Sequence, residues 1–234
     1  MDLSFFRNPK IVSNNLAFNA KTTEFFSCMG WMFLTLFISY IFITAFDSSL
    51  KYLTNISIKQ IVLVKQSENL SKVSLLYVVL IAPLIEELIF RLNLNLKRIS
   101  ILFSLIIISI ILLKNNLDFN NMTSNLNIFK SIIIAALIIG LGFAINNVVL
   151  ENIKSKYYSS FFYLNSILFG LLHISNFYSS IPNKLLVFTP IYVLPQIIGG
   201  IFFGYIRLKN GFLWGVALHC IFNLPASLIF YLNQ

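Results

Sequence analysis

The chain has 234 residues, of which 58% are hydrophobic and only 11% are charged, and its mean hydropathy is +0.83. Soluble domains carry about 25% charged residues, so this composition excludes a soluble globular protein and predicts an integral membrane protein. The formal net charge of +9 comes from Lys and Arg residues that are mostly scattered through predicted loops. In loops, such residues orient a polytopic protein and contact anionic lipid headgroups. We therefore interpret the positive charge as a determinant of membrane topology and expect no nucleic-acid partner.

Apolar runs predict an all-α bundle with about seven transmembrane helices, within a range of six to eight. A polar, interfacial arm over 1–24 precedes the first run. The connection 47–72 contains a predicted surface helix over 56–64, and an Asn-rich loop is expected over 114–127. The seven predicted spans are 25–46, 73–96, 99–113, 128–150, 157–177, 185–208 and 212–232.

Pro190, Pro195 and the pair Gly199-Gly200 interrupt the sixth run, so we expect a kinked or broken helix there. No linker or internal repeat divides the chain. It is therefore interpreted as one integrated membrane domain. Residues 1–72 supply the arm, the first helix and an interfacial loop, and residues 73–234 form a core that contains the polar motifs.

The predicted span 73–96 contains Glu86, Glu87 and Arg91 in an otherwise almost wholly apolar run. Each charge in hydrocarbon costs roughly 2.5–3.5 kcal/mol on insertion scales, so three in one span need a specific reason. On a helix, Glu87 and Arg91 share a face as i and i+4 and can neutralise each other. Glu86 lies about 100° away around the helix, which leaves its carboxylate free for chemistry.

Both histidines of the chain lie in apolar runs, and each has a helical neighbour on the same face. Phe169 pairs with His173, and His219 pairs with Asn223, at i and i+4. Together with Glu86, the two imidazoles and the Asn223 carboxamide are expected to converge from three helices near mid-membrane. Glu86 and His219 are each about ten residues, or roughly 15 Å of helix, from basic residues that end their spans.

Two kinds of amide hydrolysis suit this set of side chains. Glu86 beside a neutral histidine can deprotonate water, with burial raising the pKa of its carboxyl, while a second histidine and Asn223 donate hydrogen bonds to an oxyanion. Alternatively, Glu86, His173, His219 and Asn223 could ligate a divalent metal such as zinc that activates the water. Without catalysis, Glu86 would be a buried protonated carboxyl, Asn223 an interhelical hydrogen-bonding residue and Phe169 a packing residue.

The order of three motifs resembles a known family. Glu-Glu-x-x-x-Arg at 86–91, Phe-x-x-x-His at 169–173 and His-x-x-x-Asn at 219–223 are similar to motifs of the CPBP family. That family comprises type II CAAX prenyl endopeptidases and bacteriocin-processing or self-immunity proteins, also called the Abi family. The resemblance spans residues 86–223 and implies a CAAX-protease-like intramembrane endopeptidase of about six to eight helices around a polar intramembrane cavity. It also implies a multi-pass protein of the bacterial cytoplasmic membrane.

Carried over by matching positions, the resemblance makes Glu86 the general base, with His173 assisting it. His219 and Asn223 would form the oxyanion hole. Three further residues would support the site: Glu87, Arg91 and Phe169. The cofactor stays open between a divalent metal, which would make the protein a metalloprotease, and no metal.

The implied partners are the lipid bilayer and a membrane-associated peptide or protein substrate, and nothing in the sequence identifies a prenylated one. Two other functions stay open at this point. One is a non-catalytic bacteriocin immunity or regulatory protein, and the other is a proton or ion carrier that uses Glu86 and the histidines.

Overall fold

The computed structural model describes residues 1–11, 16–116 and 125–232, with the backbone alone at 112–116, 125–128, 130 and 131. Every regular element in these ranges is helical, as the composition predicts. The α-helices are α1 (Phe18–Thr54), α2 (Ile58–Leu70), α3 (Ala82–Phe90), α4 (Arg98–Asn116), α5 (Asn125–Ala144), α6 (Asn147–Asn152), α7 (Tyr158–Leu172), α8 (Thr189–Tyr192), α9 (Leu194–Asn210) and α10 (Phe212–Leu232). Most of the loop expected over 114–127 lies outside the described residues.

Shorter helical turns join several of these helices. Two are π-helical, Tyr77–Ile81 before α3 and Ile153–Tyr157 before α7. The others are 3-10 turns: Leu3–Phe6, Leu92–Asn95, His173–Asn176, Tyr178–Ser180 and Asn183–Phe188.

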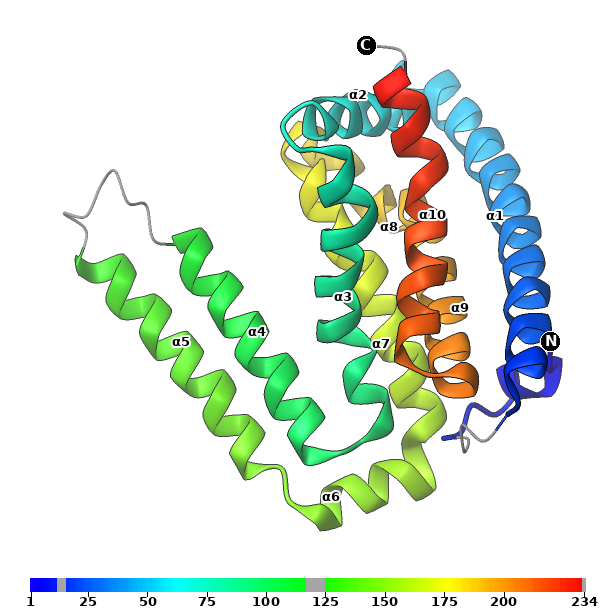
Figure 1. Cartoon of the computed structure of the whole chain (residues 1–234). Helices are drawn as coiled ribbons and strands as arrows, with labels where there is room; N and C mark the ends of the chain where they lie inside the picture. Colours follow the sequence, from blue (N-terminus) through cyan, green and yellow to red (C-terminus); the bar gives the residue numbers. More distant parts are fainter. Residues whose placement is uncertain (12–15, 117–124, 233–234) are drawn as a thin grey trace.

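Helix α9 is the centre of the bundle and packs against α1, α7 and α10 (Figure 1). Helix α3 packs against α10 and against the π-helical turn that precedes it. Helix α2 crosses one end of the bundle, near the end of α10, while α4 and α5 pair as a hairpin that leans away from the other helices (Figure 1).

The predicted count of about seven spans is not confirmed. By length and composition, three helical segments among the described residues could cross a membrane: Phe18–Thr54, Asn183–Asn210 and Phe212–Leu232. A fourth is added if Ile132–Ala144 and Asn147–Asn176 are counted as one span, although they meet at 74°. Changes of helical geometry divide some of the other apolar runs, as at the π-helical turn before α3 and at the bend after Ala144. In α4, the described apolar part, Arg98–Ile111, is shorter than a membrane span.

The sixth run is broken as expected. Its residues form a 3-10 turn, the short α8 and then α9, with Pro190 and Pro195 each in the first turn of an α-helix. Proline is tolerated at this position because the first N–H groups of a helix have no partner within it. The last run, 212–232, coincides with α10, whereas α1 is 37 residues long and extends beyond the predicted 25–46 at both ends.

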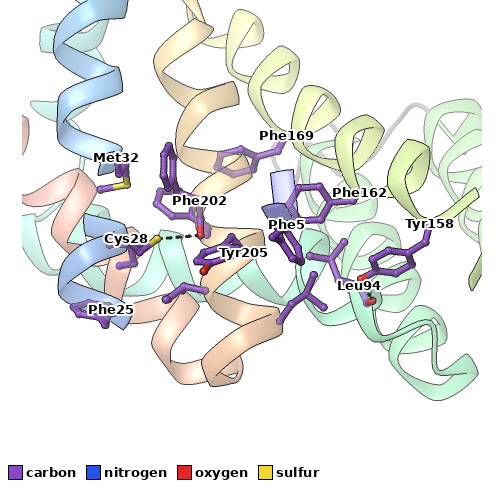
Figure 2. Close-up of a cluster of buried hydrophobic side chains, with 14 of the residues drawn as sticks. Phe5, Phe25, Cys28, Met32, Leu94, Tyr158, Phe162, Phe169, Phe202 and Tyr205 are labelled. Carbon is purple, nitrogen blue, oxygen red and sulfur yellow. Dashed lines mark hydrogen bonds between the residues drawn. The ribbon is translucent and has the colours of Figure 1, made fainter. Parts of the chain in front are cut away.

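The N-terminal arm is less polar in its contacts than expected. Phe5 is buried and packs edge-on against Phe162 of α7 and Tyr205 of α9, with ring centroids 5.4 and 4.9 Å away (Figure 2). The absence of a side chain at Gly204 makes room for this cluster, because a Cβ atom there would lie 2.8 Å from the Phe162 ring. The arm therefore contributes to the core of the bundle.

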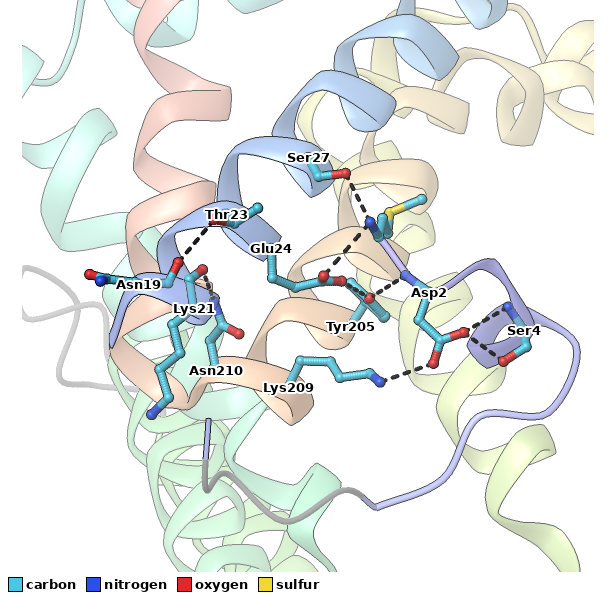
Figure 3. Close-up of polar contacts among 11 residues, drawn as sticks. Asp2, Ser4, Asn19, Lys21, Thr23, Glu24, Ser27, Tyr205, Lys209 and Asn210 are labelled. Atoms are coloured by element: carbon cyan, nitrogen blue, oxygen red, sulfur yellow. Dashed lines mark hydrogen bonds and ion pairs between the residues drawn. The ribbon is translucent and has the colours of Figure 1, made fainter. Parts of the chain in front are cut away.

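Polar contacts hold the same arm against α9 (Figure 3). The backbone N–H of Asp2 donates to the Tyr205 hydroxyl at 3.0 Å, and that hydroxyl donates to Glu24 of α1. Lys209 pairs with the Asp2 carboxylate at 3.0 Å. Hydrogen bonds from Ser4, followed by the contact with Lys209, lower the pKa of Asp2 to about 2, so its carboxylate stays ionised at physiological pH.

Helices α7 and α9 approach closely at Gly170, where an added Cβ atom would lie 2.8 Å from the backbone nitrogen of Ile197. A rigid backbone cannot yield as a flexible side chain can, so we expect Gly170→Ala to destabilise the protein by about 1–3 kcal/mol. In Gly30→Ala on α1, the new methyl group meets nothing within 4 Å, and the change should stabilise the helix by up to about 1 kcal/mol. Thermal unfolding in detergent measures both, and equal melting temperatures would contradict the close packing.

Candidate active site

Four polar side chains from three parts of the bundle line one cleft of about 800 Å³. Glu86 comes from α3, and His219 and Asn223 come from successive turns of α10. His173 is the first residue of the 3-10 turn that follows α7. The structure thus brings together all four of the residues to which the sequence analysis gives a possible catalytic role. The volume lies within the range of about 300–1,000 Å³ that is typical of ligand pockets.

The Glu86 carboxylate faces both imidazole rings. Its Oε2 atom lies 3.5 Å from Nε2 of His219 and 4.0 Å from Nε2 of His173, and this oxygen has no hydrogen-bond partner among the described residues. The side chain as a whole is 30% exposed and lines the cleft, whereas its Oε2 atom is buried. The distance to His173 exceeds a direct hydrogen bond and suits a bridging molecule of the size of water.

His173 is oriented by its own helix. Its Nδ1 atom is 2.9 Å from the backbone carbonyl oxygen of Phe169, one turn earlier. Because a carbonyl oxygen only accepts hydrogen bonds, this contact requires the proton on Nδ1. In the neutral ring, Nε2 then presents a lone pair toward Glu86. The Phe169 ring also packs edge-on against the imidazole, with centroids 5.0 Å apart.

His219 is fixed from two sides. Its Nδ1 atom is 3.0 Å from Oε1 of Glu87, and the buried ring stacks on Phe203 with centroids 4.3 Å apart and planes at 17°. The hydrogen bond between Nδ1 and the Glu87 carboxyl group aims Nε2 at Glu86 and the cleft. His219 therefore lies between two carboxylates, an arrangement that accommodates a doubly protonated ring.

Arg91 balances the charge of Glu87 in the protein interior. Both side chains are fully buried, and Nε of Arg91 is 3.8 Å from Oε1 of Glu87, which is the i, i+4 pair predicted from the sequence. The guanidinium carbon lies 4.2 Å from the centroid of the Phe169 ring, a cation–π contact. Glycines make the space, since a Cβ at Gly200 would lie 2.9 Å from Nη2 of Arg91 and one at Gly215 would lie 3.2 Å from Oε2 of Glu87.

Asn223 satisfies a carbonyl group that the helix before Glu86 leaves unpaired. Ala82 donates its backbone N–H to the Tyr77 carbonyl, in the i→i−5 register of a π-helix. The next donor in that register would be Pro83, which has no N–H. Nδ2 of Asn223 donates to the Val78 carbonyl at 3.0 Å instead. An amide carries two N–H groups, so the second can still donate to a ligand.

Residues 68–225, more than half of the chain, match the family model of the Rce1-like type II CAAX prenyl endopeptidases. The chain belongs to this Rce1-like family. No curated protein and no solved structure matches it. The match covers all three motifs and confirms the resemblance to the CPBP family of intramembrane proteases. Together with the apolar helices, membership in the Rce1-like family indicates a protease that is embedded in a membrane.

The sequence of this Rce1-like protein suggests four possible metal ligands: Glu86, His173, His219 and Asn223. In the described part of the chain, no three His, Cys, Asp or Glu side chains are grouped closely enough to hold a metal ion. Nδ1 of His219 and Nδ1 of His173 are held by Glu87 and by a backbone carbonyl, so only their Nε2 atoms face the cleft. Metal-ligating histidines commonly have their other ring nitrogen held in this way, so these contacts do not argue against a metal. The spacing of the side chains does, and no step of the mechanism below is derived through a metal.

Two features of this Rce1-like site were not anticipated from the sequence. Glu87 was expected to pair with Arg91 alone, yet it also orients His219, and helical spacing within one span cannot reveal a contact with another span. Helices α1 and α2, from the segment 1–72, also supply part of the cleft wall, including Tyr40 and Lys59. Their sequences are typical of generic helix and loop, so no motif could have indicated this.

Proposed function

We propose that this Rce1-like protein is an endopeptidase that hydrolyses peptide bonds of membrane-associated peptides or proteins, with Glu86 as the general base. The observation that carries this proposal is the Glu86 oxygen that faces two oriented imidazole nitrogens inside one cleft. The neighbouring carboxylate of Glu87 is fully buried and already paired with Arg91 and His219. Glu86 is therefore the carboxylate that can exchange a proton with water.

In the proposed first step, a water molecule donates one hydrogen bond to Glu86 and one to the Nε2 lone pair of His173. Glu86 takes a proton as the water oxygen attacks the carbonyl carbon of the substrate, and the carbonyl electron pair moves onto its oxygen. The resulting tetrahedral intermediate collapses with cleavage of the C–N bond. The proton held by Glu86 passes to the leaving nitrogen, which gives a carboxylic acid and an amine.

The oxyanion of that intermediate needs hydrogen-bond donors. One proposed donor is Nε2–H of a doubly protonated His219, whose imidazole is held in place by Glu87 and by the Phe203 ring. The second N–H of the Asn223 amide is the other. Donors fixed in this way stabilise the transition state without reorganisation, and one of them is typically worth about 10²–10³ in rate.

The test is cleavage of a library of membrane peptides by the purified protein in proteoliposomes made in H₂¹⁸O, with and without EDTA. We expect product pairs in which the new carboxyl group contains one ¹⁸O atom, at the same rate with the chelator as without it. Activity that disappears in EDTA and returns with zinc would contradict direct activation of water by Glu86. A wild-type protein that cleaves no peptide in the library would favour the non-catalytic immunity function instead.

The location of the catalytic residues completes the proposal. All of them come from 73–234, the segment that we propose as the catalytic core, while residues 1–72 contribute wall residues to the cleft. We propose the bacterial cytoplasmic membrane as the site of action, with a multi-pass arrangement of the apolar helices.

A further inference from the structure

Among the described residues that line the cleft, one is a lysine, on the helix that crosses the end of the bundle. Lys59 of α2 lines the same cleft as Glu86, which lies on α3, a helix that runs away from that end (Figure 1). The described lining contains one ammonium group, on Lys59, and one carboxylate, on Glu86, besides the two histidines. The cleft therefore combines the catalytic carboxylate with an ammonium group.

The ammonium group of Lys59 is held by neutral partners. Nζ donates to Oγ1 of Thr44 at 2.8 Å and to the hydroxyl of Tyr40 at 3.2 Å, and it lies 4.2 Å from the centroid of the Tyr40 ring. None of the ion pairs formed within the described residues includes Lys59. An ammonium carries three N–H donors, so two position the charge and the third can bind a ligand.

The backbone beneath Lys59 is fixed by a buried carboxylate. Oδ1 of Asp47 accepts the backbone N–H of Lys59 at 2.9 Å and the Tyr192 hydroxyl at 2.7 Å, and Oδ2 accepts the Ser57 hydroxyl at 2.6 Å. These bonds join the start of α2 to α1 and α8. Lys59 is therefore presented from a rigid support, which is what a binding site for a charged group requires.

We propose that Lys59, positioned by Tyr40 and Thr44, binds a carboxylate group of the substrate, so that the enzyme selects peptides with an acidic group on one side of the scissile bond. This proposal rests on the proposed endopeptidase function. A short peptide segment fits a cleft of about 800 Å³, and with its scissile bond at Glu86 it extends along the cleft toward α2. A charge-assisted hydrogen bond in a partly apolar cleft is stronger than one between neutral groups.

The probe is a set of fluorescently labelled short apolar peptides that differ only in charge. One has a terminal carboxylate, one has a terminal carboxamide, and two more carry an internal Glu or Gln with the carboxamide end. Their Kd values are measured with the Glu86→Gln protein, which binds without cleavage, in vesicles of phosphatidylcholine. The variants Lys59→Met and Lys59→Arg are introduced into this background, together with a matched control.

The control is Lys65→Met on the same helix, because Lys65 pairs with Glu68 at 2.6 Å and does not line the cleft. We expect Lys59→Met to raise the Kd of a carboxylate-bearing peptide about tenfold, the effect of one charge-assisted contact. The neutral peptides should bind as before, and Lys59→Arg should restore most of the affinity. The terminal and internal carboxylates show which kind of acidic group is selected.

Equal weakening of charged and neutral peptides by Lys59→Met would overturn the proposal, because Lys59 would then act by packing alone. The proposal would also be overturned if Lys59→Met changed the Kd of neutral peptides only in vesicles that contain phosphatidylglycerol. The anion bound by Lys59 would then be a lipid headgroup. Charge-selective binding by a protein that cleaves none of these peptides in its wild-type form would overturn the endopeptidase function and leave the carboxylate site intact.

Discussion

Replacing Glu86 by Gln should lower kcat/KM for peptide cleavage by about 10²–10⁴-fold, the range that a positioned general base contributes. Gln has nearly the same shape but cannot accept a proton from water. Folding should be almost unaffected, because Oε2 of Glu86 has no hydrogen-bond partner among the described residues and the side chain is partly exposed. Cleavage rates in proteoliposomes and melting temperatures in detergent measure the two effects.

Glu68→Gln is the matched control for this experiment. It makes the same chemical change on α2, where the carboxylate is 45% exposed and pairs with Lys65. A surface substitution of this kind changes free energies by about 0.5 kcal/mol or less, so the cleavage rate should stay within about twofold of wild type. If Glu86→Gln cleaved as fast as Glu68→Gln, Glu86 would not be the base, and the polar cluster would have to serve binding or structure.

The polar cluster of this protein could be predicted from the sequence because ionisable side chains are rare within transmembrane helices. Charges and histidines are costly in apolar helices, so Glu86, His173 and His219 were conspicuous, and helical spacing related Glu87 to Arg91. Partners on other helices were beyond the sequence. The contact of Glu87 with His219 and that of Asn223 with Val78 depend on how α10 packs against α3 and the π-helical turn before it.

The predicted span count is not confirmed, for a related reason. Hydropathy averages over a window and does not register the changes of helical geometry that polar residues and prolines impose. The predicted span 73–96 contains a π-helical turn, α3 and a 3-10 turn in succession, and the run 128–150 bends sharply after Ala144. The π-helical turn lies next to the site, where Pro83 frees the carbonyl that Asn223 binds. The features that shape the cleft are therefore the ones that periodicity misses.

Arg91→Met should destabilise the protein by about 3–5 kcal/mol, because it leaves the buried Glu87 carboxylate without its cation. Arg91 and Glu87 are both fully buried, so solvent cannot replace the lost partner. The control is Lys154→Met, which breaks an i, i+3 pair with Glu151 in which the two side chains are 51% and 71% exposed. Such surface pairs contribute about 0–1 kcal/mol. Equal destabilisation by the two substitutions would mean that Glu87 is uncharged in the folded protein.

The double variant Glu87→Gln/Arg91→Met separates stability from catalysis. Removing both buried charges together is often neutral for stability, so most of the loss caused by Arg91→Met should be recovered, as chemical unfolding of the two variants will show. Cleavage should nevertheless stay about 10²-fold below wild type, because the neutral amide introduced at position 87 no longer provides a negative charge to favour the doubly protonated His219 that donates to the oxyanion. Recovery of full activity along with stability would limit Glu87 and Arg91 to a structural role. Recovery of stability alone would make Glu87 the residue that positions and charges His219.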